Sequence, residues 1–444
     1  ADTATDGIDT TYLYDATGQL IQETTDNTGN AASVRRRQLQ SYSFGVPELE
    51  ILPVSVASMS DVRINRDVNA LGLVVWEEDG RQGVNYRTAF TYDDLKRVLT
   101  VNPPLGHTSM IVYAVDGSTA TVTRGVSGDL RRQQYSFGGF GRLRNWEDLE
   151  RQDERSIAYD SLGRKTLEQF FLGGQTADLH EFDDIGRLVR VDHPDAYDIE
   201  YDFLGSTVTV IDEELASTEL RYQAFGEPDS KRLNQVLDAE NKLWTYAYSP
   251  SNGLLTTITA PSGVSGANRS FTYTTDQLLD IETHPETGAI NHDYSAGGDR
   301  IRTAKAGLSV EFDFDGPGRL YYVDAPTGTN DVEFVYDQAS LPTTIDNTTA
   351  DYVQIWDGAQ RLTRRTATID GRTFVTNFDY DDHDRLTEII YPSGRTFVYG
   401  YDGDGRVDSI TYPGEGAYAP SITYTSHGGL DVLSYGNGAF SDLT

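Results

Sequence analysis

The chain of 444 residues is 38% hydrophobic and 11% aromatic, which excludes an intrinsically disordered protein. Its net charge of −33 excludes nucleic acid as a main partner, because phosphate binding requires clustered Lys and Arg. The absence of cysteine excludes disulfides, thiolate metal sites and cysteine nucleophiles, and the abundance of Gly, Tyr, Asp and Thr favours strands and turns over helices.

Residues 1–90 are predicted to form divergent N-terminal repeats or a cap. The sequence YDATGQL at residues 14–20 matches a unit that recurs further along the chain, whereas residues 31–88 match that unit poorly. The basic cluster at residues 35–37 is interpreted as a solvated strand face. The longest apolar run, LGLVVW at residues 71–76, is too short for a transmembrane helix, so no membrane span is predicted.

From residue 91 onward the unit recurs with a spacing of 19 to 26 residues, which indicates an array of structural repeats. Each unit is anchored by an aromatic residue that precedes a turn. Degenerate copies are anchored at Tyr113, Tyr222, Tyr248 and Tyr273. The structural repeat anchors are predicted to be Tyr92, Phe137, Tyr159, Phe182, Tyr201, Tyr294, Phe314, Tyr336, Trp356, Tyr380, Tyr401 and Tyr424.

The chemistry of one unit predicts a β-hairpin. Apolar residues alternate before the anchor, which places them on one face of a strand. The Asp that follows can bond the backbone two residues further on, and a later Gly supplies a positive φ angle. After the turn, apolar residues such as Val98 and Val101 are three positions apart. Either both faces of this strand are partly buried, or a β-bulge re-aims one residue.

Hairpins of about 20 residues must stack on their neighbours, because a two-stranded hairpin is not stable alone. Three architectures satisfy this requirement: a propeller, a flat solenoid and a continuous sheet that curls into a spiral. A propeller blade requires two hairpins, and the units show no pairwise alternation in motif strength.

The unit resembles the signature of the RHS/YD-repeat family, most clearly in YDSLGRK at 159–165, FDDIGRL at 182–188, FDGPGRL at 314–320 and YDGDGRV at 401–407. The resemblance covers about residues 90–440. This family includes bacterial Rhs toxins, wall-associated proteins, toxin-complex cocoon components and teneurins. The resemblance implies an all-β fold in which tandem hairpins form one continuous, spirally wound antiparallel sheet, as a hollow shell or part of one. It also implies a secreted or cell-surface protein.

Residues 91–444 are predicted to form the shell array of about 16 hairpins, incomplete at its C-terminal end. The sequence carries neither the DPxGxxGG-like cleavage stretch of the family nor a toxin domain after it. Residues 425–444 are therefore expected to pair with further sequence of a longer precursor or with another chain. An encapsulated polypeptide is the third expected partner.

No catalytic or cofactor-binding residues are predicted. The seven histidines occur singly, and no HExxH or GxSxG pattern is present. Asp402, Asp404 and Asp408 are spaced like part of a calcium-binding loop, but they lack its terminal Glu and coincide with the turn of a repeat. The turn is the preferred interpretation, with calcium as the alternative.

The sequence therefore favours a non-enzymatic structural protein, the wall of a shell that encloses or displays a partner or toxin domain. One alternative is an extracellular adhesin or glycan-binding module, for which surface glycans would be partners and exposed Tyr or Trp would cluster on one rim. A second alternative is a propeller-type polysaccharide-active enzyme, which requires convergent polar residues in a cleft.

Overall fold

The computed structural model describes residues 8–27, 34–81, 83–126, 129–149, 153–170, 176–193, 198–225, 227–263, 267–295, 297–326, 331–347, 349–402, 405–424 and 429–442. These ranges form β-strands, with one short 3-10 helix, Val84–Tyr86, between two of them. They contain no α-helix, and hence no helix that is long and apolar enough to cross a membrane.

One antiparallel sheet of 37 strands runs along the chain, because each strand from β1 to β36 pairs with the strand that follows it. We call β1–β24 the first coil. Its strands are β1 (Ile8–Tyr14), β2 (Leu20–Asn27), β3 (Arg35–Ser43), β4 (Val46–Leu52), β5 (Val62–Val68), β6 (Val74–Asp79), β7 (Arg87–Tyr92), β8 (Val98–Asn102), β9 (Ser109–Tyr113), β10 (Thr119–Val126), β11 (Asp129–Phe137), β12 (Leu143–Asp148), β13 (Asp153–Tyr159), β14 (Lys165–Phe170), β15 (Thr176–Phe182), β16 (Leu188–Asp192), β17 (Ile199–Leu204), β18 (Thr207–Ile211), β19 (Ser217–Phe225), β20 (Glu227–Leu237), β21 (Leu243–Tyr248), β22 (Leu255–Thr259), β23 (Arg269–Tyr273) and β24 (Leu279–His284).

The remaining strands, β25–β40, form the second coil, in which β38–β40 are a separate three-stranded antiparallel sheet. Its strands are β25 (Gly288–Tyr294), β26 (Arg300–Lys305), β27 (Leu308–Phe314), β28 (Leu320–Asp324), β29 (Val332–Tyr336), β30 (Pro342–Asn347), β31 (Ala350–Trp356), β32 (Leu362–Ile369), β33 (Arg372–Tyr380), β34 (Leu386–Ile390), β35 (Thr396–Tyr401), β36 (Val407–Tyr412), β37 (Gly416–Ala419), β38 (Ser421–Tyr424), β39 (Leu430–Ser434) and β40 (Phe440–Asp442).

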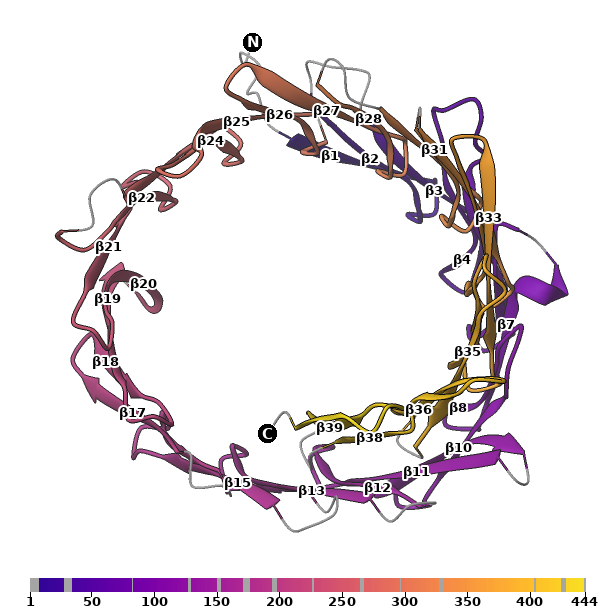
Figure 1. The fold of residues 1–444 in the computed structure, drawn as a ribbon, viewed down its shortest axis with the longest axis horizontal. Coiled ribbons are helices and arrows are strands. Elements are labelled where there is room, and N and C mark those ends of the chain that lie inside the picture. The colour runs from indigo at the N-terminus through magenta and orange to yellow at the C-terminus, as the bar shows by residue number, and fades with distance from the viewer. Residues whose placement is uncertain are drawn as a thin grey trace.

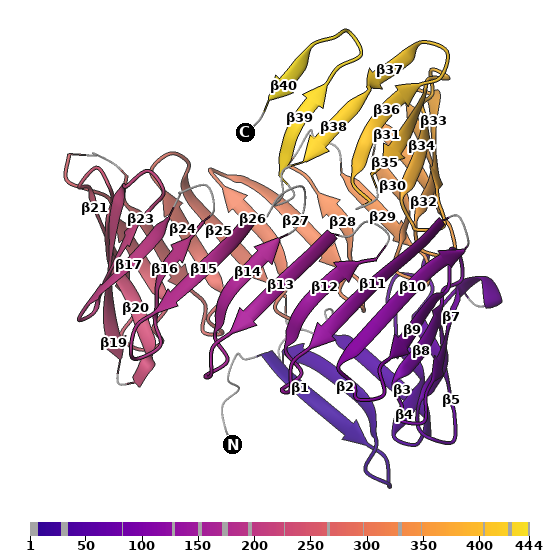
Figure 2. The ribbon, with the colours of Figure 1, turned by 90° about the horizontal axis from the view of Figure 1, so that it is seen from below.

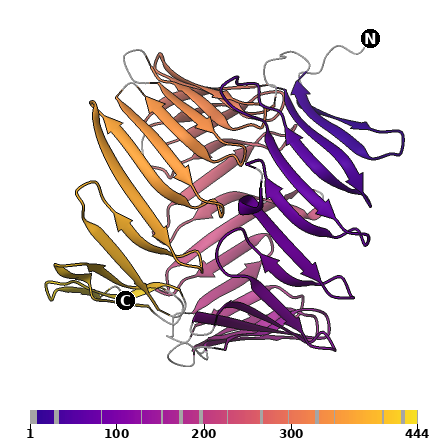
Figure 3. The ribbon, with the colours of Figure 1, turned by 90° about the vertical axis from the view of Figure 1, so that its right-hand side faces the viewer.

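The sheet winds into a spiral of more than one turn. Figure 1 shows the strands passing around a ring, with no described strand crossing its centre. In Figure 2 the second coil lies above the beginning of the first coil, and Figure 3 shows the same two layers side by side. Hydrogen bonds join residues 258 to 281 positions apart in sequence, which is the length of chain that completes one turn. The right-handed twist of neighbouring strands gives such a sheet its curl.

Because consecutive strands are antiparallel, the turns alternate between two edges of the sheet. Turns that follow odd-numbered strands up to β35 lie on what we call the lower edge, and these include the turns of the repeat motif. Turns that follow even-numbered strands lie on the upper edge. Each coil therefore presents motif turns on one edge and the connections between hairpins on the other.

A β-bulge accompanies the repeat turn and settles which way the apolar residues point. In β7–β8, Tyr92 pairs with Val98 while Thr91 pairs with Thr100, so one extra residue lies in the second strand. Phe90 then pairs with Val101. The bulge thus brings Val98 and Val101 to one face of the sheet. This is the face that carries their cross-strand partners, Tyr92 and Phe90.

The sheet is a single layer, so few side chains are fully covered. The buried apolar residues among those described are Leu39, Ile51, Val62, Ile157, Ala260 and Ala419. Stability must therefore come from contacts between adjacent hairpins and between coils, as in other repeat proteins.

The predicted fold class is confirmed: the chain is an all-β, continuous and spirally wound antiparallel sheet. The described strands are not divided into the separate four-stranded sheets of a propeller. The sheet also continues without interruption past residue 90.

Candidate functional site: the repeat turn and the contact between coils

One aspartate holds the repeat turn in place, as the turn between β13 and β14 shows. The backbone N–H of Gly163 donates to the carbonyl of Asp160 at 3.0 Å, and Gly163 has a φ of 83° that favours glycine. One carboxylate oxygen of Asp160 accepts the N–H groups of Leu162 and Arg164, both at 2.9 Å. The other accepts the Nε of Arg164 at 2.6 Å. The same three bonds recur at Asp93, Asp183, Asp357 and Asp381.

The arginine that the aspartate holds extends to the next hairpin. The guanidinium of Arg164 lies 4.6 Å from the ring centroid of Phe182, the anchor of the following unit. Stacking of a planar cation on an aromatic face is favourable, and the aspartate fixes its orientation. Equivalent contacts of 4.2 to 4.8 Å are made by Arg97 on Tyr113, Arg187 on Phe203, Arg319 on Tyr336, Arg361 on Tyr380, Arg385 on Tyr401 and Arg406 on Tyr424.

The anchor tyrosine makes the reverse connection, to the hairpin before it. The hydroxyl of Tyr401 donates to the carbonyl of Leu386 at 2.5 Å, and Leu386 directly follows the arginine that stacks on the Tyr401 ring. Burial raises the pKa of this hydroxyl, so it remains a donor at neutral pH. The same bond to a preceding hairpin is donated by Tyr42, Tyr92, Tyr159, Tyr248, Tyr273, Tyr294, Tyr336, Trp356, Tyr380 and Tyr424.

All twelve anchors predicted from the sequence are half-buried. Eleven of them end a strand before a turn, whereas Tyr201 lies inside β17, which continues to Leu204. Arg187 there stacks on Phe203 at 4.2 Å, so Phe203 occupies the place that the spacing assigned to Tyr201. The sequence YDFLGST has no arginine after its glycine, and this departure from the motif is the signal for the shift.

The lower edge of the second coil contacts the upper edge of the first. Arg81, after β6, donates to the carbonyl of Asp357 at 2.8 Å. Arg124, at the end of β10, donates to the carboxylate of Asp384 at 2.6 Å. Arg361 binds the other oxygen of Asp384 at 2.9 Å, so the carboxylate joins both coils. The sequence motif gave no indication of these partners, because they are more than 250 residues apart.

The approach of the two coils is close enough to require glycine. A Cβ at Gly358 would lie 2.1 Å from the carbonyl oxygen of Asn85, and a Cβ at Gly316 would lie 2.0 Å from that of Pro53. Both glycines follow the aspartate of a motif turn. Real Cβ atoms do not approach a backbone oxygen so closely, and any larger residue would push the coils apart.

Two histidines that are far apart in the sequence lie close together between the coils. The N–H of His107 donates to the carbonyl of Asp382 at 3.1 Å, and the rings of His107 and His383 are 5.2 Å apart, edge to face. A second grouping lies within one hairpin pair, where Glu282 accepts hydrogen bonds from His284 at 2.9 Å and His292 at 3.3 Å. These hydrogen bonds lower the pKa of Glu282, with burial opposing them.

The calcium alternative can be compared with the part of its loop that the structure describes. Asp402 accepts both the backbone N–H and the Nε of Arg406 at 2.9 Å, as a turn aspartate does. Asp408 accepts the hydroxyl of Ser409 at 2.8 Å. Asp404 lies outside the described residues. No group of three or more His, Asp or Glu side chains in the described ranges is arranged to hold a metal ion.

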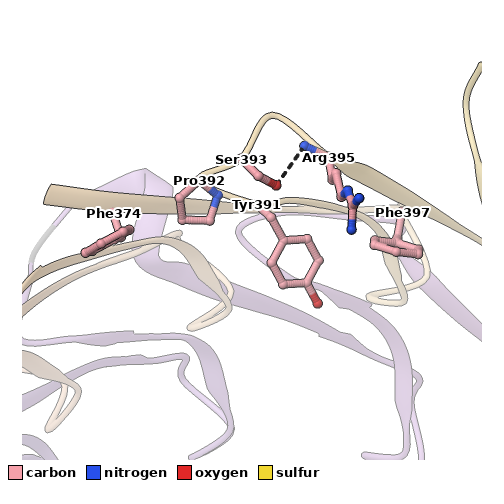
Figure 4. Close-up of a pocket in the computed structure, with 6 residues that line it drawn as sticks. All are labelled: Phe374, Tyr391, Pro392, Ser393, Arg395 and Phe397. Carbon is pink, nitrogen blue, oxygen red and sulfur yellow. Dashed lines mark hydrogen bonds between the residues drawn. The ribbon is translucent and has the colours of Figure 1, made fainter.

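The upper edge of the second coil carries an aromatic pocket of about 560 Å³. Phe374 of β33, Tyr391 and Pro392 of the turn after β34, and Phe397 of β35 line it with Ser393 and Arg395 (Figure 4). The rings of Tyr391 and Phe397 are 5.7 Å apart in a T-shaped contact. Phe397 also stacks on Tyr412 at 5.8 Å, so the pocket is part of a larger aromatic cluster.

Comparison with known proteins agrees with this geometry. Residues 356–396 and 380–417 match the family described as RHS Repeat. No curated protein matches the chain in sequence.

Solved structures of a similar fold include "Crystal Structure of TcdB2-TccC3-TEV", with a TM-score of 0.74 and 12% identity over 98% of this chain and 30% of that chain. A second is "Crystal Structure of TcdB2-TccC3 without hypervariable C-terminal region", with a TM-score of 0.73 and 12% identity over 99% of this chain and 31% of that chain. The chain thus spans under a third of their length, and at this identity the likeness concerns the fold. The family match shows RHS repeats over residues 356–417, and along the rest of the chain the repeat motif and the spiral fold are similar to those of the RHS/YD-repeat family.

Proposed function

We propose that the chain is a non-enzymatic wall segment of an RHS shell that encloses or displays a partner polypeptide outside the cell. The observation that carries this proposal is the single-layer sheet that winds around a ring whose centre no described strand crosses (Figure 1). A layer of this kind separates an inside from an outside. The repeat residues described above serve to join hairpins and coils, which is a structural task.

The fold of the TcdB2-TccC3 structures supports the proposal, because it is shared over nearly the whole chain. The name of one of them refers to a hypervariable C-terminal region, which is a property of that protein. For this chain, an enclosed partner remains part of the proposal, as does the location at the cell surface or outside the cell.

Protease protection tests enclosure. A disordered, protease-sensitive peptide is fused after residue 444, and its cleavage rate is compared with that of the same fusion carrying Arg81→Glu and Arg124→Glu, which open the contact between coils. We expect slower cleavage in the unaltered chain. Equal rates in the two proteins would contradict enclosure.

A screen with polysaccharide, ester and peptide substrates tests the absence of enzymatic activity. The proposal predicts no turnover above that of a mock purification. Turnover that copurifies with the chain through two different chromatographic steps would overturn it.

A further inference from the structure

The lower edge of the first coil carries a row of exposed apolar side chains. Large apolar residues lie at or beside eight consecutive lower-edge turns, from the turn after β3 to the turn after β17. Each has at least 60% of its surface exposed. We call this row the apolar rim, and its members are Phe44, Leu71, Leu95, Val115, Phe140, Leu162, Ile185 and Leu204. Single exposed apolar residues are ordinary, but a continuous row along one edge marks a surface for binding.

The equivalent turns of the second coil are different, and they are the ones that are covered. Leu95, Leu162 and Ile185 stand two positions after the motif aspartate. In the second coil this position is held by Pro317, Ala339, Ala359 and His383, in turns that contact the upper edge of the first coil. Motif turns can thus dock on an upper edge, and three of the four positions in the narrow contact already present hold small residues.

Large residues at the same position require a wider apolar receptor, and the chain carries one. The pocket formed by Phe374, Tyr391, Pro392 and Phe397 lies on the upper edge of the second coil, between adjacent hairpins. Its volume of about 560 Å³ is large enough for a Leu or Ile side chain with room to spare. Arg395 beside it is exposed, and so are Asp94 and Asp184 beside Leu95 and Ile185.

We propose that the apolar rim docks on the aromatic upper edge of a second copy of this chain, so that the molecules stack coil on coil. The contact is heterologous, because it joins two different surfaces, and repeated use of it builds an open stack. It extends the edge-to-edge packing that already joins the first and second coils. This inference concerns assembly and goes beyond the proposed role as a shell wall.

The stack is held by apolar burial against the repulsion of two strongly acidic molecules. Self-association therefore strengthens as salt screens the net charge, which is the opposite of an interface held by ion pairs. Sedimentation velocity across a range of concentrations and salt measures this. The proposal predicts a mass that rises with concentration and rises further at high salt. A monomer under all these conditions would overturn it.

Variants on each surface test the geometry. The rim variant, Leu95→Ser/Leu162→Ser/Ile185→Ser, is expected to weaken association at least about tenfold, because buried apolar side chains would be lost. The pocket variant, Phe374→Ser/Tyr391→Ser, is expected to do the same. The control, Met110→Ser/Val353→Ser/Ile355→Ser, removes a similar number of exposed apolar side chains from strands away from the rim and should associate like the unaltered chain. Circular dichroism and melting curves establish that all three variants fold.

Mixing the rim variant with the pocket variant is the decisive experiment. Each retains one intact surface, so the mixture should form 1:1 dimers that do not grow, although neither variant associates alone. Failure of the mixture to form dimers would overturn the proposal. It would also be overturned by a monomeric chain whose rim instead binds lipid vesicles, or whose Tyr391 instead binds oligosaccharides on a glycan array.

Discussion

At the scale of single residues, the motif works as a relay between successive hairpins. Arg385 is fixed by Asp381 and lies over the ring of Tyr401, while the hydroxyl of Tyr401 returns to the carbonyl of Leu386. These two units are therefore tied together by one stacked cation and one hydrogen bond. This pairing explains why the array uses Tyr more than Phe at the anchor.

The hydroxyl bond can be removed without changing the ring. Tyr401→Phe leaves the carbonyl of Leu386 without its side-chain donor, and we expect a loss of about 0.5–1.5 kcal/mol in local stability. Hydrogen exchange of the amides in β34 and β35 measures this opening free energy. Tyr399→Phe is the matched control, because its hydroxyl makes no hydrogen bond within the described part of the chain. Equal exchange in the two variants would contradict the relay.

The turn aspartate was predictable from the sequence, whereas the relay was not. An Asp after a strand bonds the backbone two residues on by local geometry alone, and His383 and Leu162 donate in this way. The partner of Tyr401 depends on how one hairpin lies beside another, which no spacing within the motif specifies. Phe203 was missed because the spacing assigned its place under Arg187 to Tyr201, although the missing arginine in YDFLGST marked a departure from the motif.

At the scale of the hairpin, one carboxylate fixes the turn and the arginine together. Asp381 accepts the N–H groups of His383 and Arg385 and the Nε of Arg385. The bulge beside this turn, where Tyr380 pairs with Leu386 and Asp379 pairs with Glu388, then gives the second strand its face. The sequence left this choice open, because apolar residues three positions apart fit either a bulge or a strand that is buried on both faces.

Replacement of this carboxylate by an amide should loosen the hairpin. We expect Asp381→Asn to lower the free energy of unfolding by about 1–2 kcal/mol. This is toward the lower end of the range for hydrogen bonds to charged groups, because Arg385 is partly exposed. Chemical unfolding measures the loss. The control is Asp379→Asn, which removes an exposed carboxylate from β33, the strand before this turn, and should leave stability nearly unchanged. Similar losses in both variants would show that general charge is responsible.

The pKa of the same carboxylate determines how the hairpin is expected to respond to acid. Burial acts to raise the pKa of Asp381, but the N–H and guanidinium of Arg385 outweigh it and hold the pKa below 3.8. Because the folded-state pKa is depressed, its contribution to stability is present above the unfolded pKa and is lost as pH falls through the folded value. Unfolding curves from pH 7 to pH 3 should therefore converge for the unaltered chain and Asp381→Asn below about pH 4. A constant difference across this range would contradict the assignment.

At the scale of the whole molecule, the repeat predicted a curled sheet but neither its radius nor the contacts between coils. The curl accumulates from small twists and bulges in every hairpin, so the position of Arg124 opposite Asp384 follows from the sum of many units. One signal was present in the sequence. Three of the four docking turns carry Gly, Ala or Pro near the tip, as at Gly316 and Ala359, and the fourth carries His383, whereas free turns carry large apolar residues such as Leu162.

Cross-linking between the coils tests the spiral most directly, because the chain has no native cysteine to interfere. In the variant Arg124→Cys/Asp384→Cys, the two thiols replace side chains that are in contact across the coils. A short bifunctional maleimide should join them within one molecule at low protein concentration, and Arg124→Cys/Asp184→Cys, whose second thiol lies on a lower-edge turn of the first coil, should give no such product. Equal cross-linking of the two pairs, or none in the first, would contradict the stacked spiral.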